Sequence, residues 1–499
     1  MPKQMIFIMT DTQRKDMLGC YGNKAMITPN LDGLAAEGIL FERAYTTQPV
    51  CGPARSAIFT GLYPHTNGCI ANCIGLESTV KNVGQRLQHE GIHTAYIGKW
   101  HLDGGDYFGK GVCPEGWDEK YWYDMRCYLE ELTEEERVRS RRSASVLEGD
   151  GITEEFTYGY RCAVRAEEFL KQHGNEDFFL VVSLDEPHDP FLAPAEYAKE
   201  YEDYELEDRD NFYDSLEGKP LHHRLWAGEA LSEDRSSGYR RKEPLFLGCN
   251  TFADRQIGRV LDAWRAHAPE ALVMYTSDHG DMLGSHRLEA KGPAAYEEIT
   301  NIPFILAGKQ VQERGAVNEY PVSHIDIVPT VLDYFKAFPY KMLPGKSLLG
   351  VLSDSRKKIR DMVFMEFGRY ETAHDYFGGF QPMRCVFDGR FKLVINLLSS
   401  DELYDLQEDP GEMHNLIEAK EPEQIRDRLH DRLLTWMNET RDPFRGYSFR
   451  CRPWRKDAAP ATWNDSGMTR QKEADYDEKQ ELRYIDGLLA NPASYPVIR

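Results

Sequence analysis

The chain has 499 residues, which is enough for roughly two to four average domains or for one large enzyme with a smaller appended unit. Acidic residues outnumber basic ones by 82 to 60, and the resulting formal net charge of -22 argues against a nucleic-acid partner or an anionic membrane surface. A small anionic substrate remains compatible with this charge, because a local group of Arg, Lys and His can reverse its sign inside one pocket.

Five short apolar runs alternate with helical patterns along the chain, and each run reads as a buried strand. This alternation is typical of an α/β fold, in which a mostly parallel sheet is covered by helices on both faces. None of the runs is long enough to span a membrane. The predicted strands cover residues 5–10, 94–98, 178–183, 272–276 and 303–307.

Chemically capable side chains follow four of these five strands. Asp11 follows the first strand and Lys99 the second, while His188 lies shortly after the third. Asp278 and His279 follow the fourth. Because ligands of open α/β sheets bind beyond the carboxyl ends of the strands, we expect these residues to converge in space.

A short helix is predicted between the first and second strands. Pro53 suits the first turn of a helix and Gly61 suits its end, so the helix should cover residues 53–60. Cys51 would then lie at the helix N-terminus, where free N–H groups and the helix dipole favour an anion and lower the pKa of a thiol. The alternative is a buried, inert cysteine, since cysteine is among the most buried residue types.

The remaining sequence predicts surface insertions and a change of fold near the C-terminus. Residues 130–160 and 198–243 are charged and weakly periodic, as in loops that overhang a site. Residues 384–395 predict an antiparallel hairpin around Asp388 and Gly389. We therefore expect three parts: a catalytic α/β domain over 1–365, a small α+β subdomain over 366–440, and an extension over 441–499 that contacts another copy in a homo-oligomer.

Cysteine usage favours a reducing compartment. The ten cysteines are scattered, without a Cys-x-x-Cys pair or a dense framework. The apolar run at residues 5–9 reads as a core strand rather than as part of a signal peptide. We therefore expect a cytoplasmic protein.

Several separated motifs resemble those of the type I, formylglycine-dependent sulfatases of the alkaline phosphatase superfamily. The first is Cys51 with Pro at +2 and Arg55 at +4, which resembles the maturation signature of that family. The others are Asp11, Lys99-Trp100-His101, Glu186-Pro187-His188, Asp278-His279 and Lys291. The resemblance extends over residues 1–440 and implies a large, mostly parallel sheet between helices, followed by a smaller C-terminal antiparallel sheet.

The resemblance also implies a covalent mechanism at Cys51. A formylglycine-generating or anaerobic maturation enzyme would oxidise Cys51 to an aldehyde, whose hydrate carries two hydroxyls. One hydroxyl attacks sulfur, and the other later expels sulfate by re-forming the aldehyde. By the same resemblance Arg55 holds a hydroxyl of the hydrate, Lys99 holds a sulfate oxygen, and His101 takes the proton from the second hydroxyl.

Three further residues would contact the substrate. His188 and Lys291 would bind the sulfate and help the alcohol to leave. Asn72, a little beyond the helix, would contact the anion.

The implied metal ligands are Asp11, Asp278, His279 and the oxygen of formylglycine 51. Relatives usually carry a second Asp beside the first, and this chain has Thr12 there. Calcium prefers several hard oxygens, whereas an imidazole with fewer carboxylates also suits manganese. Calcium is the first expectation, with manganese as the alternative.

The motifs predict hydrolysis of a sulfate monoester, with a small sulfated carbohydrate as substrate. Thr12 and His279 also fit relatives that cleave phosphonate or phosphate esters, whereas the His of Lys99-Trp100-His101 favours sulfate. A third alternative is a non-catalytic, sulfatase-like binding protein, in which Cys51 would remain a thiol.

Overall fold

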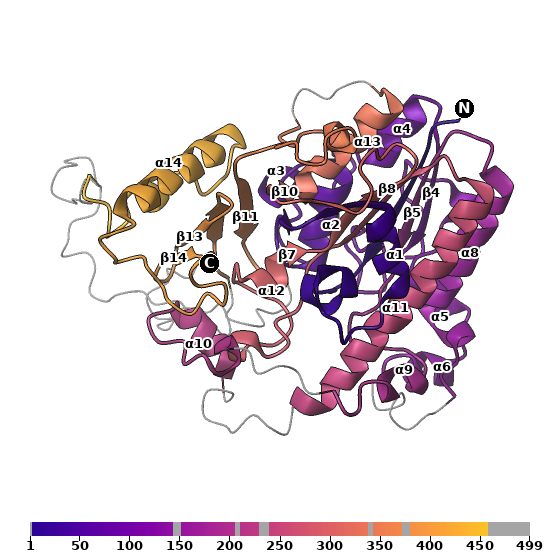
Figure 1. Cartoon of the computed structure of the whole chain (residues 1–499), viewed down its shortest axis with the longest axis horizontal. Coiled ribbons are helices and arrows are strands. Elements are labelled where there is room, and N and C mark those ends of the chain that lie inside the picture. Colours follow the sequence, from indigo (N-terminus) through magenta and orange to yellow (C-terminus); the bar gives the residue numbers. More distant parts are fainter. Residues whose placement is uncertain are drawn as a thin grey trace, which may run out of the picture.

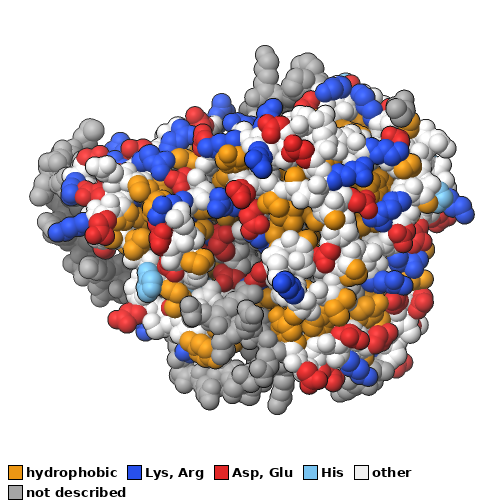
Figure 2. Space-filling model, in the orientation of Figure 1, with side chains coloured by type: hydrophobic (Ala, Val, Ile, Leu, Met, Phe, Trp, Pro, Cys, Tyr) orange, Lys and Arg blue, Asp and Glu red, His pale blue; other side chains and the backbone are white. Residues whose placement is uncertain are grey.

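The computed structural model describes residues 2–142, 151–204, 210–228, 239–337, 343–371 and 380–457. Figure 1 shows a larger α/β lobe and a smaller lobe on the left of the view. On the face in Figure 2, basic and acidic side chains are interspersed over both lobes. The predicted fold class, a mostly parallel sheet between helices with a smaller antiparallel sheet, is confirmed.

The large sheet contains all five predicted strands. Its four neighbouring strands β4, β5, β1 and β6 run parallel, and β8 and β2 continue the sheet in antiparallel pairs. The spatial order is β4 (His93–Gly98), β5 (Phe178–Ser183), β1 (Gln4–Thr10), β6 (Leu272–Ser277), β8 (Phe304–Ala307), β2 (Gly38–Phe41) and β9 (Ala316–Asn318).

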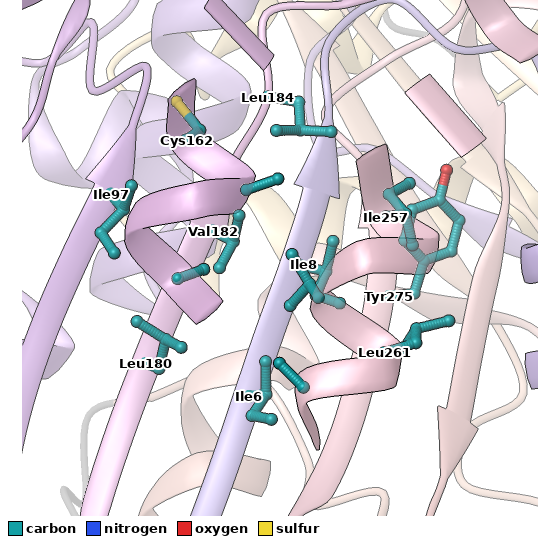
Figure 3. Packing of buried hydrophobic residues seen from close by; sticks show 14 of the residues in the cluster. Ile6, Ile8, Ile97, Cys162, Leu180, Val182, Leu184, Ile257, Leu261 and Tyr275 are labelled. Atoms are coloured by element: carbon teal, nitrogen blue, oxygen red, sulfur yellow. The ribbon is translucent and has the colours of Figure 1, made fainter. Parts of the chain in front are cut away.

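Both faces of this sheet are buried, which explains why its strands are continuously apolar. Ile6 and Ile8 of β1 point to one face, and Met5 and Phe7 to the other, all with no exposed surface. Figure 3 shows Ile6 and Ile8 packed with β5 residues beneath two helices. The helices on that face are α1 (Pro29–Glu37), α5 (Met125–Glu130), α8 (Tyr158–His173) and α11 (Tyr239–His267). Those on the other face are α2 (Cys51–Thr60), α4 (Val83–His89) and α13 (Ile327–Phe335).

Helix α2 begins two residues earlier than predicted. Val50 caps it in an extended conformation, so Cys51 is the first residue of the helix rather than a residue before it. Gly61 ends the helix as expected, with φ of 71° and its N–H donated to the Ala57 carbonyl. Every residue of α2 is buried, so Cys51 is held within the core of the large lobe.

The smaller lobe is a four-stranded antiparallel sheet with one long helix against it. The predicted hairpin is confirmed: β12 pairs with β13 across the turn at Asp388 and Gly389. Phe449 and Trp454 pack with Trp436 in the core of the same lobe, so the start of the predicted extension folds back on its own chain. Residues 458–499 lie outside the described part, and the domain boundaries remain predictions. The elements are β11 (Val363–Phe367), β12 (Met383–Phe387), β13 (Phe391–Asn396), β14 (Glu402–Asp405), α14 (Glu423–Glu439) and α15 (Tyr447–Arg450).

The other described elements are short. In the described ranges no helix is long and apolar enough to cross a bilayer. All ten cysteines are free thiols. The short elements are β3 (Ala44–Tyr45), β7 (Asn301–Ile302), β10 (Val322–Ser323), α3 (Pro64–Asn67), α6 (Glu134–Arg139), α9 (Ala195–Lys199), α10 (Leu221–Ala227) and α12 (Glu297–Thr300).

Gly98 at the end of β4 leaves no room for a side chain. Its φ is +127°, and an added Cβ would lie 1.9 Å from the Ser183 carbonyl oxygen. We expect Gly98→Ala to lower the free energy of unfolding by more than about 3 kcal/mol, measured by urea denaturation.

Gly68→Ala is the matched control, because Gly68 also has positive φ, +92°, but has no atom within 4 Å of an added Cβ. Gly68→Ala should lower the free energy of unfolding by about 1 kcal/mol, from backbone strain alone. If both variants lost the same free energy of unfolding, the close approach of Ser183 to Gly98 would not be the reason that position 98 requires glycine.

Candidate active site

The carboxyl ends of four neighbouring strands deliver acidic and basic side chains to one buried place. Asp11 follows β1, Lys99 follows β4, Asp185 follows β5 and Asp278 follows β6. Helix α2 brings Cys51 to the same place, with its Sγ 3.6 Å from Asp11 Oδ1. The predicted convergence of residues far apart in the sequence is therefore present in the fold.

Four side chains form a cluster that fits a divalent cation. The donor atoms of Asp11, Cys51, Asp278 and His279 all lie within 4.8 Å of one another, and all four residues are buried. His279 Nδ1–H donates to the Gly280 carbonyl at 2.8 Å, which leaves Nε2 directed at the cluster, 3.1 Å from Cys51 Sγ. A second ring nitrogen fixed in this way is typical of histidines that ligate metals.

Arg55 holds the two carboxylates of this cluster. Its Nη2 donates to Asp11 Oδ2 at 2.9 Å and its Nε to Asp278 Oδ2 at 3.0 Å, with all three side chains fully buried. Nη1 donates to the Lys99 carbonyl at 2.6 Å and to Ser183 Oγ at 2.8 Å. The predicted role of Arg55, holding a hydroxyl on residue 51, remains a prediction; the contacts described here fix the two carboxylates of the cluster.

Thr12 forms hydrogen bonds with both carboxylates of the cluster. Its hydroxyl donates to Asp11 Oδ1 at 2.7 Å, and its N–H donates to Asp278 Oδ1 at 3.1 Å. Thr12 therefore adds hydrogen bonds to both carboxylates but no negative charge.

Lys99 is a buried cation between two acids. Its Nζ lies 2.8 Å from Asp11 Oδ2 and 3.0 Å from Asp185 Oδ1. Tyr107 was not predicted: its hydroxyl donates to Asp185, and its ring centroid lies 3.9 Å from Lys99 Nζ. Tyr107 lies in a glycine-rich loop without periodicity, so the sequence carries no signal for its position.

The surrounding charges favour the thiolate form of Cys51. Burial and the Asp11 carboxylate oppose ionisation of the thiol, but Lys291 and Lys99 outweigh them. The pKa of Cys51 is therefore well below its usual value. A place that stabilises negative charge on residue 51 suits a nucleophile.

His101 lies within hydrogen-bonding reach of Cys51. Strand β4 ends at Gly98, and His101 has a left-handed backbone with φ of 57°. Burial lowers the pKa of His101, so its ring is neutral near pH 7 and can accept a proton.

His188 and Lys291 contact each other. His188 Nδ1 lies 2.8 Å from the Asp189 carbonyl oxygen, and His188 Nε2 lies 2.8 Å from Lys291 Nζ. Burial opposes the charged form of Lys291, yet nearby Cys51 raises its pKa well above the usual value. The two residues form one hydrogen-bonded donor pair.

Asn72 packs beside the first turn of α2 without belonging to that helix. Its Oδ1 accepts the Gly52 N–H at 2.9 Å, and its own N–H donates to the Tyr370 carbonyl at 2.9 Å. Asn72 therefore links the residue after Cys51 to the segment that follows β11. Contact with a substrate anion remains a prediction for this residue.

Comparisons with known proteins agree with this geometry. A family model described as Sulfatase matches residues 3–337, and one described as N-sulphoglucosamine sulphohydrolase, C-terminal, matches residues 284–439. The chain is 47% identical over 461 residues to the uncharacterized sulfatase YidJ of Escherichia coli (strain K12), with 91% of each chain covered.

Two solved structures show the same fold at lower identity. One, in complex with its substrate D-glucosamine-2-N,6-O-disulfate, has a TM-score of 0.74 at 21% identity and covers 89% of this chain and 99% of its own. The other, the phosphonate monoester hydrolase of Agrobacterium radiobacter, has a TM-score of 0.74 at 23% identity and covers 88% and 96%. The chain belongs to the sulfatase family. These matches confirm the predicted type I sulfatase family.

Metal binding at this cluster should depend steeply on pH. Burial and the adjacent Asp11 raise the pKa of Asp278 to about 7 in the metal-free protein. Burial opposes protonation of His279, but Asp278 outweighs it and raises that pKa as well. A cation needs the ionised carboxylate and the neutral imidazole, so its binding releases protons. Affinity for Mn²⁺ should fall at least about tenfold per pH unit below pH 7 and level off at higher pH.

Calorimetric titration in two buffers of different ionisation enthalpy measures both the affinity and the protons released. Asp281→Asn is the control, since Asp281 lies nearby but outside the cluster and accepts the Leu283 N–H. Binding that is independent of pH, with no proton release, would contradict the assignment of Asp278 as a ligand.

Proposed function

We propose that this sulfuric ester hydrolase cleaves a sulfate monoester of a small carbohydrate, using a formylglycine derived from Cys51 and one divalent cation. The observation that carries the proposal is the placement of Cys51: a buried side chain at a helix start, 3.1 Å from His279 Nε2 and surrounded by Lys99, Lys291 and Arg55. The structural relative bound to a disulfated glucosamine supports a sugar substrate.

The cationic side chains would bind and orient the sulfate. Lys99 and Lys291 are buried ammonium groups next to residue 51, and buried charges act more strongly on an anion than exposed ones. A cation held by Asp11, Asp278, His279 and residue 51 would supply Lewis-acid polarisation of the sulfate. Calcium is the ion we propose, with manganese as the alternative that the imidazole ligand favours.

Proton transfers would be divided between two groups of residues. A formylglycine hydrate at position 51 supplies one hydroxyl as nucleophile and a second for the release of sulfate. The neutral ring of His101 would take the proton of the second hydroxyl, and its hydrogen-bonding contact with residue 51 supports this role. Either Lys291 or His188, whose Nζ and Nε2 lie 2.8 Å apart, would protonate the leaving oxygen.

Three further proposals concern the cellular context. A formylglycine-generating or anaerobic maturation enzyme would convert Cys51. A cytoplasmic location is supported by the ten cysteines, none of which is paired in a disulfide. Residues 441–499 are proposed as a contact in a homo-oligomer.

Removal of the nucleophile should abolish sulfate release. Cys51→Ala should lower kcat on an aryl sulfate by at least about a thousandfold, because the covalent step is lost. Cys385→Ala is the matched control: it removes another buried thiol, in β12, and should leave kcat within about twofold of wild type.

Mass spectrometry of the Cys51 peptide from the native host accompanies this assay. An aldehyde at residue 51 supports the enzyme, whereas a thiol in all molecules would favour the non-catalytic binding protein. Near-normal turnover by Cys51→Ala would overturn the proposed mechanism.

A phosphonate or phosphate ester hydrolase is the second candidate. Thr12 in place of an acid and the fold shared with a phosphonate monoester hydrolase favour it. His101 beside Cys51 favours sulfate. We expect kcat/KM for an aryl sulfate to exceed that for the matching aryl phosphonate monoester by at least about tenfold, in a paired assay with one leaving group. If the phosphonate were preferred, the proposed substrate class would be wrong, but the assignment of residue 51 as nucleophile would stand.

A further inference from the structure

A second cluster of potential metal ligands lies at the other end of the large sheet. His93 is the first residue of β4, His173 is the last residue of α8, and Glu176 lies between α8 and β5. Lys99, at the catalytic cluster, follows the opposite end of β4. Six residues of strand separate the two places by about 20 Å.

The three side chains direct donor atoms at one point. Glu176 Oε2 lies 2.9 Å from His173 Nδ1 and 3.8 Å from His93 Nδ1. The ligand atoms of all three residues lie within 4.8 Å of one another. A four-coordinate ion with bonds of about 2.0–2.2 Å holds neighbouring ligands about 3.3–3.6 Å apart, so shifts of about 1 Å in these side chains would bring the three donor atoms to that spacing.

The outward nitrogens of both rings are held by other groups. His93 Nε2 lies 2.9 Å from Asp118 Oδ2, and His173 Nε2 lies 2.5 Å from the Tyr121 hydroxyl. A carboxylate or hydroxyl on the second ring nitrogen fixes ring orientation and tautomer, as at histidines that ligate metals. Phe169 packs against both rings at centroid distances of 5.3 and 4.8 Å and limits their rotation.

The position also permits entry of an ion. The side chains of His93 and His173 are 23% and 17% exposed, and that of Glu176 is 56% exposed. Two imidazoles and one carboxylate are a donor set that suits zinc, with a fourth position open to water. We propose that His93, His173 and Glu176 form a zinc site that links the start of β4 to the end of α8, separate from the catalytic cluster.

Zinc titration of the full chain tests this site. The catalytic cluster also takes divalent ions, so the titration uses Asp278→Asn protein, stripped with chelator and followed by equilibrium dialysis with metal analysis. We expect one bound zinc, which raises the melting temperature. In the same background, His93→Ala with His173→Ala should weaken zinc binding by at least about a hundredfold and abolish the shift in melting temperature.

His89→Ala is the matched control, since His89 is 84% exposed at the end of α4 and its pairing with Glu90 lies outside the site. It should bind zinc as the Asp278→Asn parent does. Glu176→Gln changes an exposed side chain and should fold normally while weakening zinc binding by at least about tenfold. Tyr121→Phe removes the hydroxyl that contacts His173 Nε2, and with it the exposed contacts of that hydroxyl with Gln172 and Lys120, and should weaken zinc binding by about tenfold.

Absence of zinc binding by the Asp278→Asn protein would overturn the proposal. So would equal stoichiometry and affinity in the double His variant and the His89→Ala control. In either case the cluster would be a network of ion pairs that needs no metal.

Discussion

The buried ion pairs of Arg55 with Asp11 and Asp278 are the interaction on which the site depends. Parallel strands bring these two acids together, and two unpaired carboxylates in a core would strongly destabilise it. The same guanidinium binds the Lys99 carbonyl and Ser183 Oγ, so one side chain joins the ends of β1, β4, β5 and β6. Because Arg55 lies one helical turn after Cys51, it also fixes where residue 51 meets the carboxylates.

This arrangement separates the charge of the site from the charge of the molecule. The chain carries a net charge of -22, yet Cys51 is faced by Lys99 and Lys291. The long-range field is screened within about 8–10 Å at physiological salt, whereas buried charges a few ångströms apart are screened much less. An anionic ester would therefore be bound by local charges, and overall acidity does not oppose catalysis.

Much of the fold and the cluster could be predicted because both depend on local patterns. Continuous apolar runs marked the strands, and polar residues after them marked the strand ends where Asp11, Asp278 and His279 meet. Tyr107 could not be predicted, since its place over Lys99 depends on how a loop closes. Nor could the cluster of His93, His173 and Glu176 be predicted: His173 and Glu176 are three residues apart, but His93 lies 80 residues before His173 and only the packing of β4 against α8 brings it to them. The start of α2 was wrong by two residues because Pro53 fits any position in a first turn.

The burial of Cys51 has a consequence for how active molecules arise. Its side chain is 1% exposed, beneath the ordered strand ends and loops of the large lobe. A protein-sized catalyst cannot reach this thiol in the native state, so any enzymatic conversion must act on the nascent or unfolded polypeptide. The fraction of catalytically active molecules then depends on the rate of Cys51 conversion relative to the rate of folding during biosynthesis. Chains that fold first would remain permanently inert despite having the correct architecture.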